Sequence, residues 1–189
     1  KGTTYRASVN LRDVEGVGIN SGYTQINARL NLTQKALNDR LTFSLNIAAT
    51  TKDADYGFTE TFQNAIVANP TMPILFDGTA GLTDVGGYAE RDIFQFWNPV
   101  SIAEQNINDG TDLSMLGSFK AEYDFADVVE GLRASVFYSQ QRKTEERGQY
   151  YTSTAKWVGQ SGPNGVANRS MAMQFNQLIE TTLNYDKEF

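Results

Sequence analysis

The chain has 189 residues, the length of one ordinary domain, and its 16 basic and 22 acidic side chains give a formal net charge of −6. It contains neither cysteine nor histidine, which excludes disulfides, thiolate metal sites and Ser-His-Asp or Cys-His nucleophile systems. The acidic balance argues against a nucleic-acid partner, which requires clustered lysine and arginine.

Alternation of apolar and polar side chains predicts six β-strands in chain order. In the first, Tyr5, Ala7 and Val9 interleave with polar neighbours. The other segments repeat this pattern, although Phe137 interrupts the polar set of the fifth. The predicted strands cover about residues 3–12, 23–33, 41–51, 114–125, 132–141 and 175–186. The fold class indicated is therefore all-β and antiparallel.

The connections between these segments alternate between short and long. Residues 34–40 and 126–131 form short links, whereas about residues 52–113 and 142–173 form long loops. The first connection, 13–22, is intermediate and glycine-rich. One end of the sheet should therefore carry short turns and the other should carry large loops, as in outer-membrane barrels. A loop of some sixty residues is usually functional.

Strand length agrees with a membrane-spanning β-barrel. About ten residues at ~3.3 Å each, tilted by ~45°, project to roughly 23 Å, close to the ~25 Å apolar band of such barrels. Aromatic residues near strand ends are typical of interfacial girdles; we place Tyr5, Tyr23, Phe125, Tyr138 and Tyr185 there. No apolar run approaches the roughly 18–20 residues of a membrane helix. Because the strands of a soluble β-sandwich also alternate, that fold stays open as the alternative.

The barrel interpretation requires more chain than is present. The first residues run directly into a strand pattern, and the last stop just past one. Six strands do not close into a channel, and an open sheet leaves two unpaired edges. We therefore expect this chain to be a fragment of a protein that extends both ways.

Several segments together resemble one protein family. They are residues 5–13 (YRASVNLRD), 27–34 (NARLNLTQ), 39–43 (DRLTF), 68–74 (ANPTMPI), 97–100 (WNPV), 116–125 (LGSFKAEYDF), 130–132 (EGL) and 180–185 (ETTLNY). In this order and spacing they resemble the SusC/RagA family of TonB-linked outer-membrane proteins of Bacteroidetes. The likeness covers nearly the whole chain.

The resemblance implies a 22-stranded transmembrane β-barrel of the bacterial outer membrane, with long extracellular loops, short periplasmic turns and an internal plug. It implies import of oligosaccharides or oligopeptides, a SusD-like surface lipoprotein as a lid over the mouth, and energy supplied by TonB. The TonB box and the plug match no part of this chain, so those functions cannot be placed on its residues.

Aromatic side chains in the long loops are the candidates for ligand or lid contact. Aromatic rings stack on sugar faces and also bury well against a partner. The candidates are Tyr88, Phe94, Phe96, Trp97, Tyr150, Tyr151 and Trp157. A loop folded on its own aromatic cluster would use the same residues. Phe58, Phe62, Ala65 and Ile66 have helical spacing and predict a short helix ending before Pro70, with an apolar stripe that packs the loop down.

The polar sides of the predicted strands supply a second candidate set. If the apolar side of each strand faces lipid, its polar side faces the barrel lumen. The expected lumen-facing residues are Arg6, Asn27, Arg29, Lys120, Glu122, Arg133 and Glu180.

The sequence supplies no case for a cofactor, a metal or catalysis. Asp53 with Asp55, and Asp109 with Asp112, lack the spacing of an EF-hand loop and are better explained as turn residues. No nucleophile–base–orienter set is present, so we expect no enzyme. The alternatives to an importer are a soluble β-sandwich that binds carbohydrate at its long-loop end, and a surface adhesin.

Overall fold

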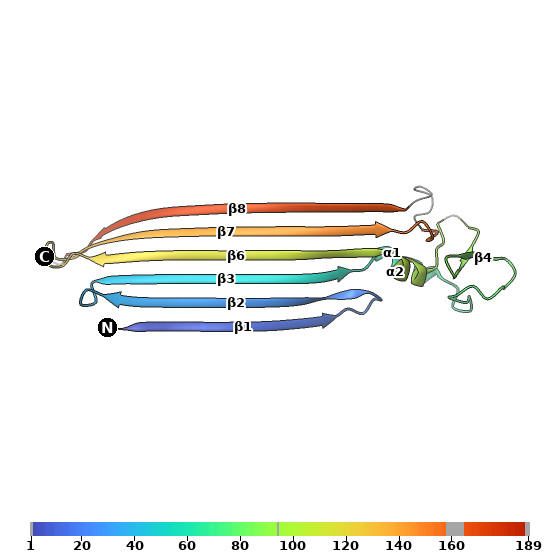
Figure 1. Cartoon of the computed structure of the whole chain (residues 1–189), viewed down its shortest axis with the longest axis horizontal. Helices are drawn as coiled ribbons and strands as arrows, with labels where there is room; N and C mark the ends of the chain where they lie inside the picture. Colours follow the sequence, from blue (N-terminus) through green and yellow to red (C-terminus); the bar gives the residue numbers. More distant parts are fainter. Residues whose placement is uncertain (1, 94, 158–164, 188–189) are drawn as a thin grey trace.

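A computed structural model describes residues 2–93, 95–157 and 165–187. Six long strands form one antiparallel sheet in the order β1-β2-β3-β6-β7-β8. They are β1 (Thr3–Glu15), β2 (Ser21–Ala36), β3 (Leu41–Tyr56), β6 (Ile107–Asp124), β7 (Leu132–Tyr151) and β8 (Val166–Tyr185). Figure 1 shows them as long arrows that lie side by side and point alternately in opposite directions. The all-β antiparallel fold predicted from alternation is confirmed.

Short and long connections segregate to opposite ends of the sheet, as the sequence predicts (Figure 1). Residues 37–40 form a tight link in which Leu37, Asn38 and Asp39 have positive φ angles of 53°, 57° and 69°. The opposite end carries the connections 16–20, 57–106 and 152–165. We call this the loop end.

The strands extend further towards the loop end than the alternation predicts. β7 continues to Tyr151 and β8 begins at Val166, so the second loop spans 152–165 instead of 142–173. The first loop likewise spans 57–106 instead of 52–113. The predicted bounds were too short because the added residues include Glu145, Glu146 and Arg147, whose charge resembles that of a loop although their backbone pairs with β6 and β8.

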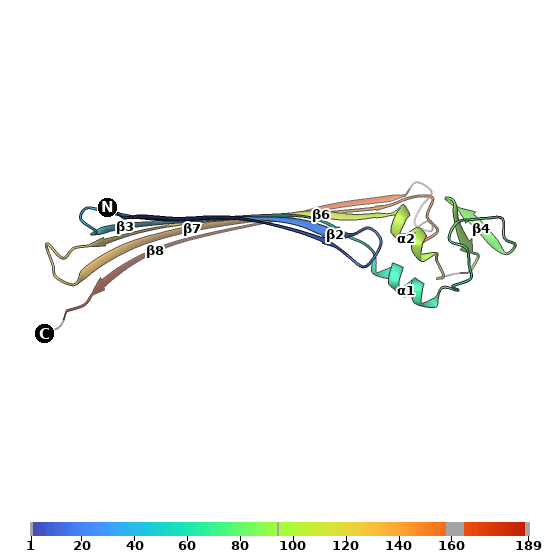
Figure 2. The same cartoon turned by 90° about the horizontal axis from the view of Figure 1, so that it is seen from below.

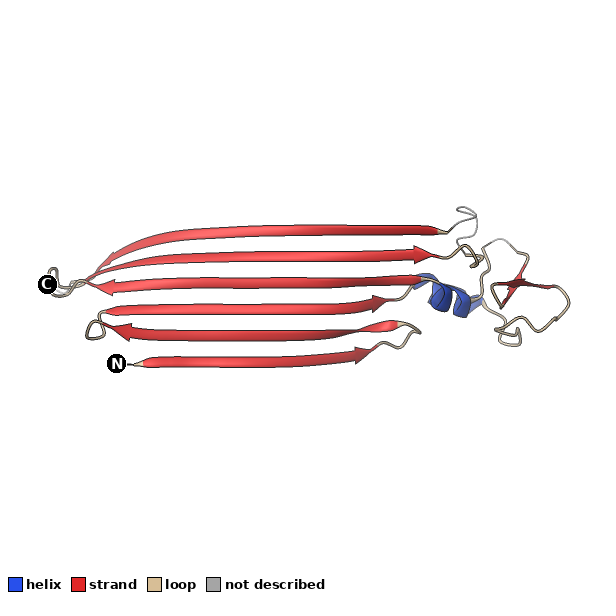
Figure 3. Cartoon of the chain, in the orientation of Figure 1, coloured by secondary structure: helices blue, strands red, loops and turns tan. Residues whose placement is uncertain are grey.

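The first long loop folds into a small unit of its own. It contains helix α1 (Thr59–Val67), helix α2 (Pro99–Gln105) and a hairpin of β4 (Leu82–Val85) and β5 (Tyr88–Arg91). We call residues 57–106 the loop unit. Figure 3 shows that the helices lie only at this end of the sheet. Helix α1 matches the predicted helix before Pro70. In the described residues, no helix is long and apolar enough to cross a membrane.

The buried residues lie in the loop unit and around it, and the long sheet has almost none. Among the described residues, the buried apolar side chains are Ala54, Phe58, Ala89, Ile102, Ala103 and Ala155. Figure 2 shows the sheet edge-on as a single layer. The accessible surface is 12865 Å², whereas a compact monomer of this mass exposes about 9000 Å². The excess follows from a sheet that no second layer covers.

The register assigns the two faces of the sheet. One row runs Tyr5, Leu32, Leu45, Phe119, Tyr138 and Ile179 across all six strands. We call this side the apolar face and the opposite side the polar face. The predicted girdle residue Tyr23 is on the polar face, because it is three residues from Ile26 and so has the opposite parity. The placement of Tyr23 was therefore wrong.

Substitution of Gly131 tests how the turn between β6 and β7 depends on glycine. The φ of Gly131 is +81°, and a Cβ there would collide with the backbone carbonyl of Asp186. We expect Gly131→Ala to lower the free energy of unfolding by about 1–3 kcal/mol, measured by denaturant titration. Gly117→Ala is the matched control, because a Cβ at Gly117 meets nothing within 4 Å, and it should be neutral or stabilise by up to about 1 kcal/mol. Equal effects of the two substitutions would contradict this account.

Candidate functional site

The polar face carries all seven residues of the predicted lumen-facing set. Arg6, Asn27 and Arg29 lie on β1 and β2, and Lys120 and Glu122 lie on β6. Arg133 pairs with Asp124, and Glu180 pairs with Phe137, which places both on the same side. The structure thus brings the seven residues to one face, spread along most of its length.

Cations and aromatic rings alternate on this face near the loop end. The Lys52 ammonium lies 4.7 Å from the Tyr23 ring centroid and 5.7 Å from that of Tyr56. The Arg12 guanidinium lies 5.5 Å from Tyr23, and that of Arg147 lies 5.0 Å from Tyr56. These separations fall in the range in which a cation is attracted by the ring quadrupole. We call these five residues the cation–ring tract.

Sequence reasoning missed the cation–ring tract. Its members come from β1, β2, β3 and β7, so they meet only through strand register. The available signal was parity: with the apolar set fixed at Ile26 and Ala28, Tyr23 belongs with Gln25 and Asn27 on the polar side. The odd or even position of a residue along its strand gives the face on which it lies, but not its partner on the neighbouring strand.

The predicted aromatic contact residues are divided between internal packing and exposure. Tyr151 and Trp157 pack with Phe58, with ring centroids 5.1–5.7 Å apart, and so tie the second loop to the first. Phe96 and Tyr150 are exposed. Trp97 is half-buried, and Phe94 is outside the described residues. Tyr150 and Tyr151 belong to β7 rather than to a loop.

Tyr88 is held inside the loop unit. Its hydroxyl donates to the Glu104 carboxylate, and this hydrogen bond, with burial, raises the pKa of Tyr88 to about 12. The phenol is therefore protonated at any physiological pH. Tyr88 is half-buried, and its hydrogen bond to Glu104 ties β5 to α2.

Buried polar groups organise the loop unit. Asn98 caps α2 by accepting from the N–H groups of Val100 and Ser101, while its amide nitrogen donates to the carbonyls of Ile74 and Ala89. The backbone N–H of Asn98 donates to both oxygens of the Glu90 carboxylate at 3.1 Å. These contacts join three segments without a large apolar core.

Burial raises the pKa of the Glu90 carboxyl above its ordinary value, although the Asn98 N–H and the charge of Lys156 oppose the change. Lys156 donates to the backbone carbonyls of Arg91 and Ile93. Two further contacts tie the second loop to the helix α2 region: Thr152 N–H donates to Asn106, and Thr154 donates to Gln105. Residues 152–157 of the second loop therefore pack against the loop unit.

The stripe of α1 is more exposed than the sequence predicts. Phe58 is buried, whereas Phe62 and Ile66 are 51% and 85% exposed. Aromatic partners from β7 and the second loop reach only Phe58, the residue just before α1, whereas the Phe62 ring lies beside Gly18 of the 16–20 connection.

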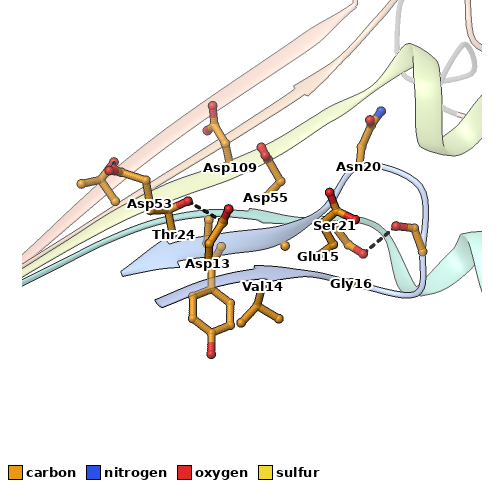
Figure 4. Close-up of a pocket in the computed structure, with 15 residues that line it drawn as sticks. Asp13, Val14, Glu15, Gly16, Asn20, Ser21, Thr24, Asp53, Asp55 and Asp109 are labelled. Atoms are coloured by element: carbon orange, nitrogen blue, oxygen red, sulfur yellow. Dashed lines mark hydrogen bonds between the residues drawn. The ribbon is translucent and has the colours of Figure 1, made fainter. Parts of the chain in front are cut away.

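Acidic side chains gather on the apolar side of the sheet at the loop end. A pocket of about 640 Å³ is lined by Asp13, Glu15, Asp53, Asp55 and Asp109, among others (Figure 4). Asp13 accepts a hydrogen bond from Thr24, and Asp53 accepts one from Thr111. Asp53 and Asp55 belong to β3, and Asp109 and Asp112 belong to β6, so the prediction that these two pairs are turn residues was wrong. No described group of three or more carboxylates is close enough to hold a metal ion.

Comparison with known protein families and with curated proteins gives no match for this chain.

Glu90 makes the stability of the loop unit depend on pH. A raised folded-state pKa means that the contribution of Glu90 is fully present below the unfolded value of 4.5 and is lost as pH rises through the folded value. After correction for intrinsic rates, the amides of Ala89 and Asn98 should exchange more slowly at pH 5 than at pH 8. Glu90→Gln should remove this difference, with β6 amides as the internal reference. Greater protection at pH 8 in the unmodified chain would contradict the sign.

Proposed function

We propose that this chain is a segment of a transmembrane β-barrel of the bacterial outer membrane, whose apolar face contacts lipid and whose polar face lines the lumen. The observation that carries the proposal is the uncovered apolar face. Tyr5, Val9 and Ile179 are each more than 70% exposed, and monomeric soluble proteins rarely expose contiguous apolar patches above a few hundred Å².

The length of the apolar row on β6 suits a bilayer, although Arg142 of β7 lies beside Met115 on the same face. On β6, the residues of this face from Leu113 to Tyr123 are apolar at every second position. Ten residues at ~3.3 Å span ~33 Å, which a 45° tilt projects to ~23 Å against a ~25 Å apolar band. Beyond this band, the same face turns acidic at Asp13, Asp53 and Asp109. Such a boundary fits the passage from lipid to water.

The two edge strands support a larger closed sheet. β1 and β8 have 13 and 20 residues, and each pairs with a strand on one side only. Exposed edges of this length promote aggregation unless they are paired. A barrel removes them, and the SusC/RagA resemblance supplies a 22-stranded one.

Within that barrel, we propose TonB-dependent import of oligosaccharides or oligopeptides with a SusD-like lipoprotein as the lid. The loop unit stands at the end that would face outward, and its exposed Phe62, Ile66 and Phe96 suit contact with such a lid. The polar face would guide substrate after capture. No catalytic role is proposed.

A soluble carbohydrate-binding or adhesin module receives less support. A sandwich packs a second sheet on the apolar face of the first. In the described residues, the only other sheet is the two-stranded β4–β5 hairpin inside the loop unit.

Single cysteines distinguish the two functions, because the chain has none of its own. Leu45→Cys and Ile47→Cys change the apolar face, and Asn46→Cys and Ala48→Cys change the polar face of the same strand. With a fluorophore on each cysteine and the native polypeptide in vesicles, we expect a nitroxide on the lipid chains to quench positions 45 and 47 at least about threefold more than 46 and 48. Water-soluble thiol reagents should show the reverse preference. Absence of lipid quenching at all four positions would contradict the barrel.

A further inference from the structure

Charge on the polar face is unevenly distributed. On β1, β2 and β3 this face carries five basic side chains and no acidic one: Arg6, Arg12, Arg29, Lys35 and Lys52. The acidic residues of the same strands, Asp13, Glu15, Asp53 and Asp55, all lie on the opposite side. A chain with a net charge of −6 thus presents a wholly basic surface on half of its polar face.

Among the described residues on the polar face of β6 and β7, three of the four basic side chains have an acidic partner, with Arg133 as the exception. Lys120 pairs with Glu122, Lys143 with Glu145, and Arg147 with Asp112. In the part of the chain that the structure describes, none of the five basic residues of β1–β3 forms an ion pair. Arg12 and Lys52 lie against tyrosine rings instead, which leaves their charges available to an anion.

Neutral polar groups surround these charges. Gln25 and Thr50 both donate to the Asn27 side chain, at 3.0 and 2.8 Å, beside Lys52 on the same face. Amides and hydroxyls of this kind can also bond the hydroxyl groups of a sugar. The cation–ring tract adds the rings of Tyr23 and Tyr56, flat surfaces at the edge of the same region.

A peptide fits this surface less well. Peptides are commonly recognised by pairing with a free sheet edge or through apolar pockets for alternate side chains. β2 and β3 are paired on both sides, and closure of the proposed barrel would also pair the free edge of β1. The polar face of β2 and β3 offers mainly Ser, Thr, Asn, Gln and basic side chains.

We propose that the polar face of β1–β3 binds oligosaccharides that carry carboxylate groups, of the uronic-acid type. Arg12, Arg29 and Lys52 would meet the carboxylates, and Gln25, Asn27 and Thr50 the sugar hydroxyls. The inference rests on the proposed importer and narrows its substrate to an acidic glycan. Since exposed charges are screened by salt, binding should weaken as ionic strength rises.

The test compares a hexamer of galacturonic acid with its methyl ester, which has the same backbone without the charge. Binding to the detergent-purified native polypeptide that contains this chain is measured by calorimetry. We expect the acid to bind at least about tenfold more tightly than the ester at 50 mM salt, and to lose most of that advantage at 500 mM, where the Debye length falls to ~4 Å. Equal binding of acid and ester, or no binding of either, would overturn the proposal.

Charge-removing variants locate the site. Arg12→Gln with Lys52→Gln should weaken binding of the acid about tenfold and leave the ester unchanged, at about threefold per charge removed. Lys143→Gln is the matched control, because it removes one charge from the same face at a residue already paired with Glu145. Far-ultraviolet circular dichroism checks that each variant is folded. A Lys143→Gln effect as large as that of the double variant would overturn the assignment to β1–β3.

Binding of a glutamate hexamer, measured in the same way, tests whether the surface prefers an acidic peptide. Binding as tight as that of the uronate would overturn the glycan assignment in favour of an acidic peptide. These outcomes are independent of the importer itself: a polypeptide that requires detergent and shows the lipid quenching described above, yet binds no acid preferentially, refutes the acidic glycan alone.

Discussion

The two-residue period of a β-strand is the constraint on which the rest of this structure depends. It sends Leu45 and Ile47 to one side of the sheet and Asn46 and Lys52 to the other. Register carries that division across six strands, and no second layer covers the apolar side among the described residues. The folding stability of the large sheet must therefore come from its backbone hydrogen bonds and from the medium that contacts its apolar face.

The same constraint separates the charges. Asp53 and Lys52 are adjacent in sequence but lie on opposite faces, so the acidic pocket and the basic surface form within one layer of backbone. Neither is visible in the net charge. The loop unit follows a different principle: there buried Asn98 and Glu90 join short segments through hydrogen bonds, and among its described apolar side chains only Phe58, Ala89, Ile102 and Ala103 are buried.

Strand existence, the order of short and long links, and helix α1 could be predicted from sequence because each is a local pattern. Strand ends could not, because Glu145 to Arg147 look like a loop until their partners on β6 and β8 are known. Parity alone would have placed Tyr23 correctly. Its contact with Lys52 required the β2–β3 register, and the packing of Phe58 with Trp157 joins residues about a hundred positions apart. The role of Glu90 had no sequence signal, since burial of a carboxyl depends on tertiary packing.

The most direct test of the central claim, that the apolar face meets lipid, is the intact mass of the native polypeptide together with its distribution between aqueous and detergent-extracted envelope fractions. The account predicts a species of about 100 kDa or more that only detergent releases, since ~22 strands at the length seen here, with their loops, require several times this chain. A species of 21.0 kDa in the aqueous fraction would contradict it and favour the soluble module.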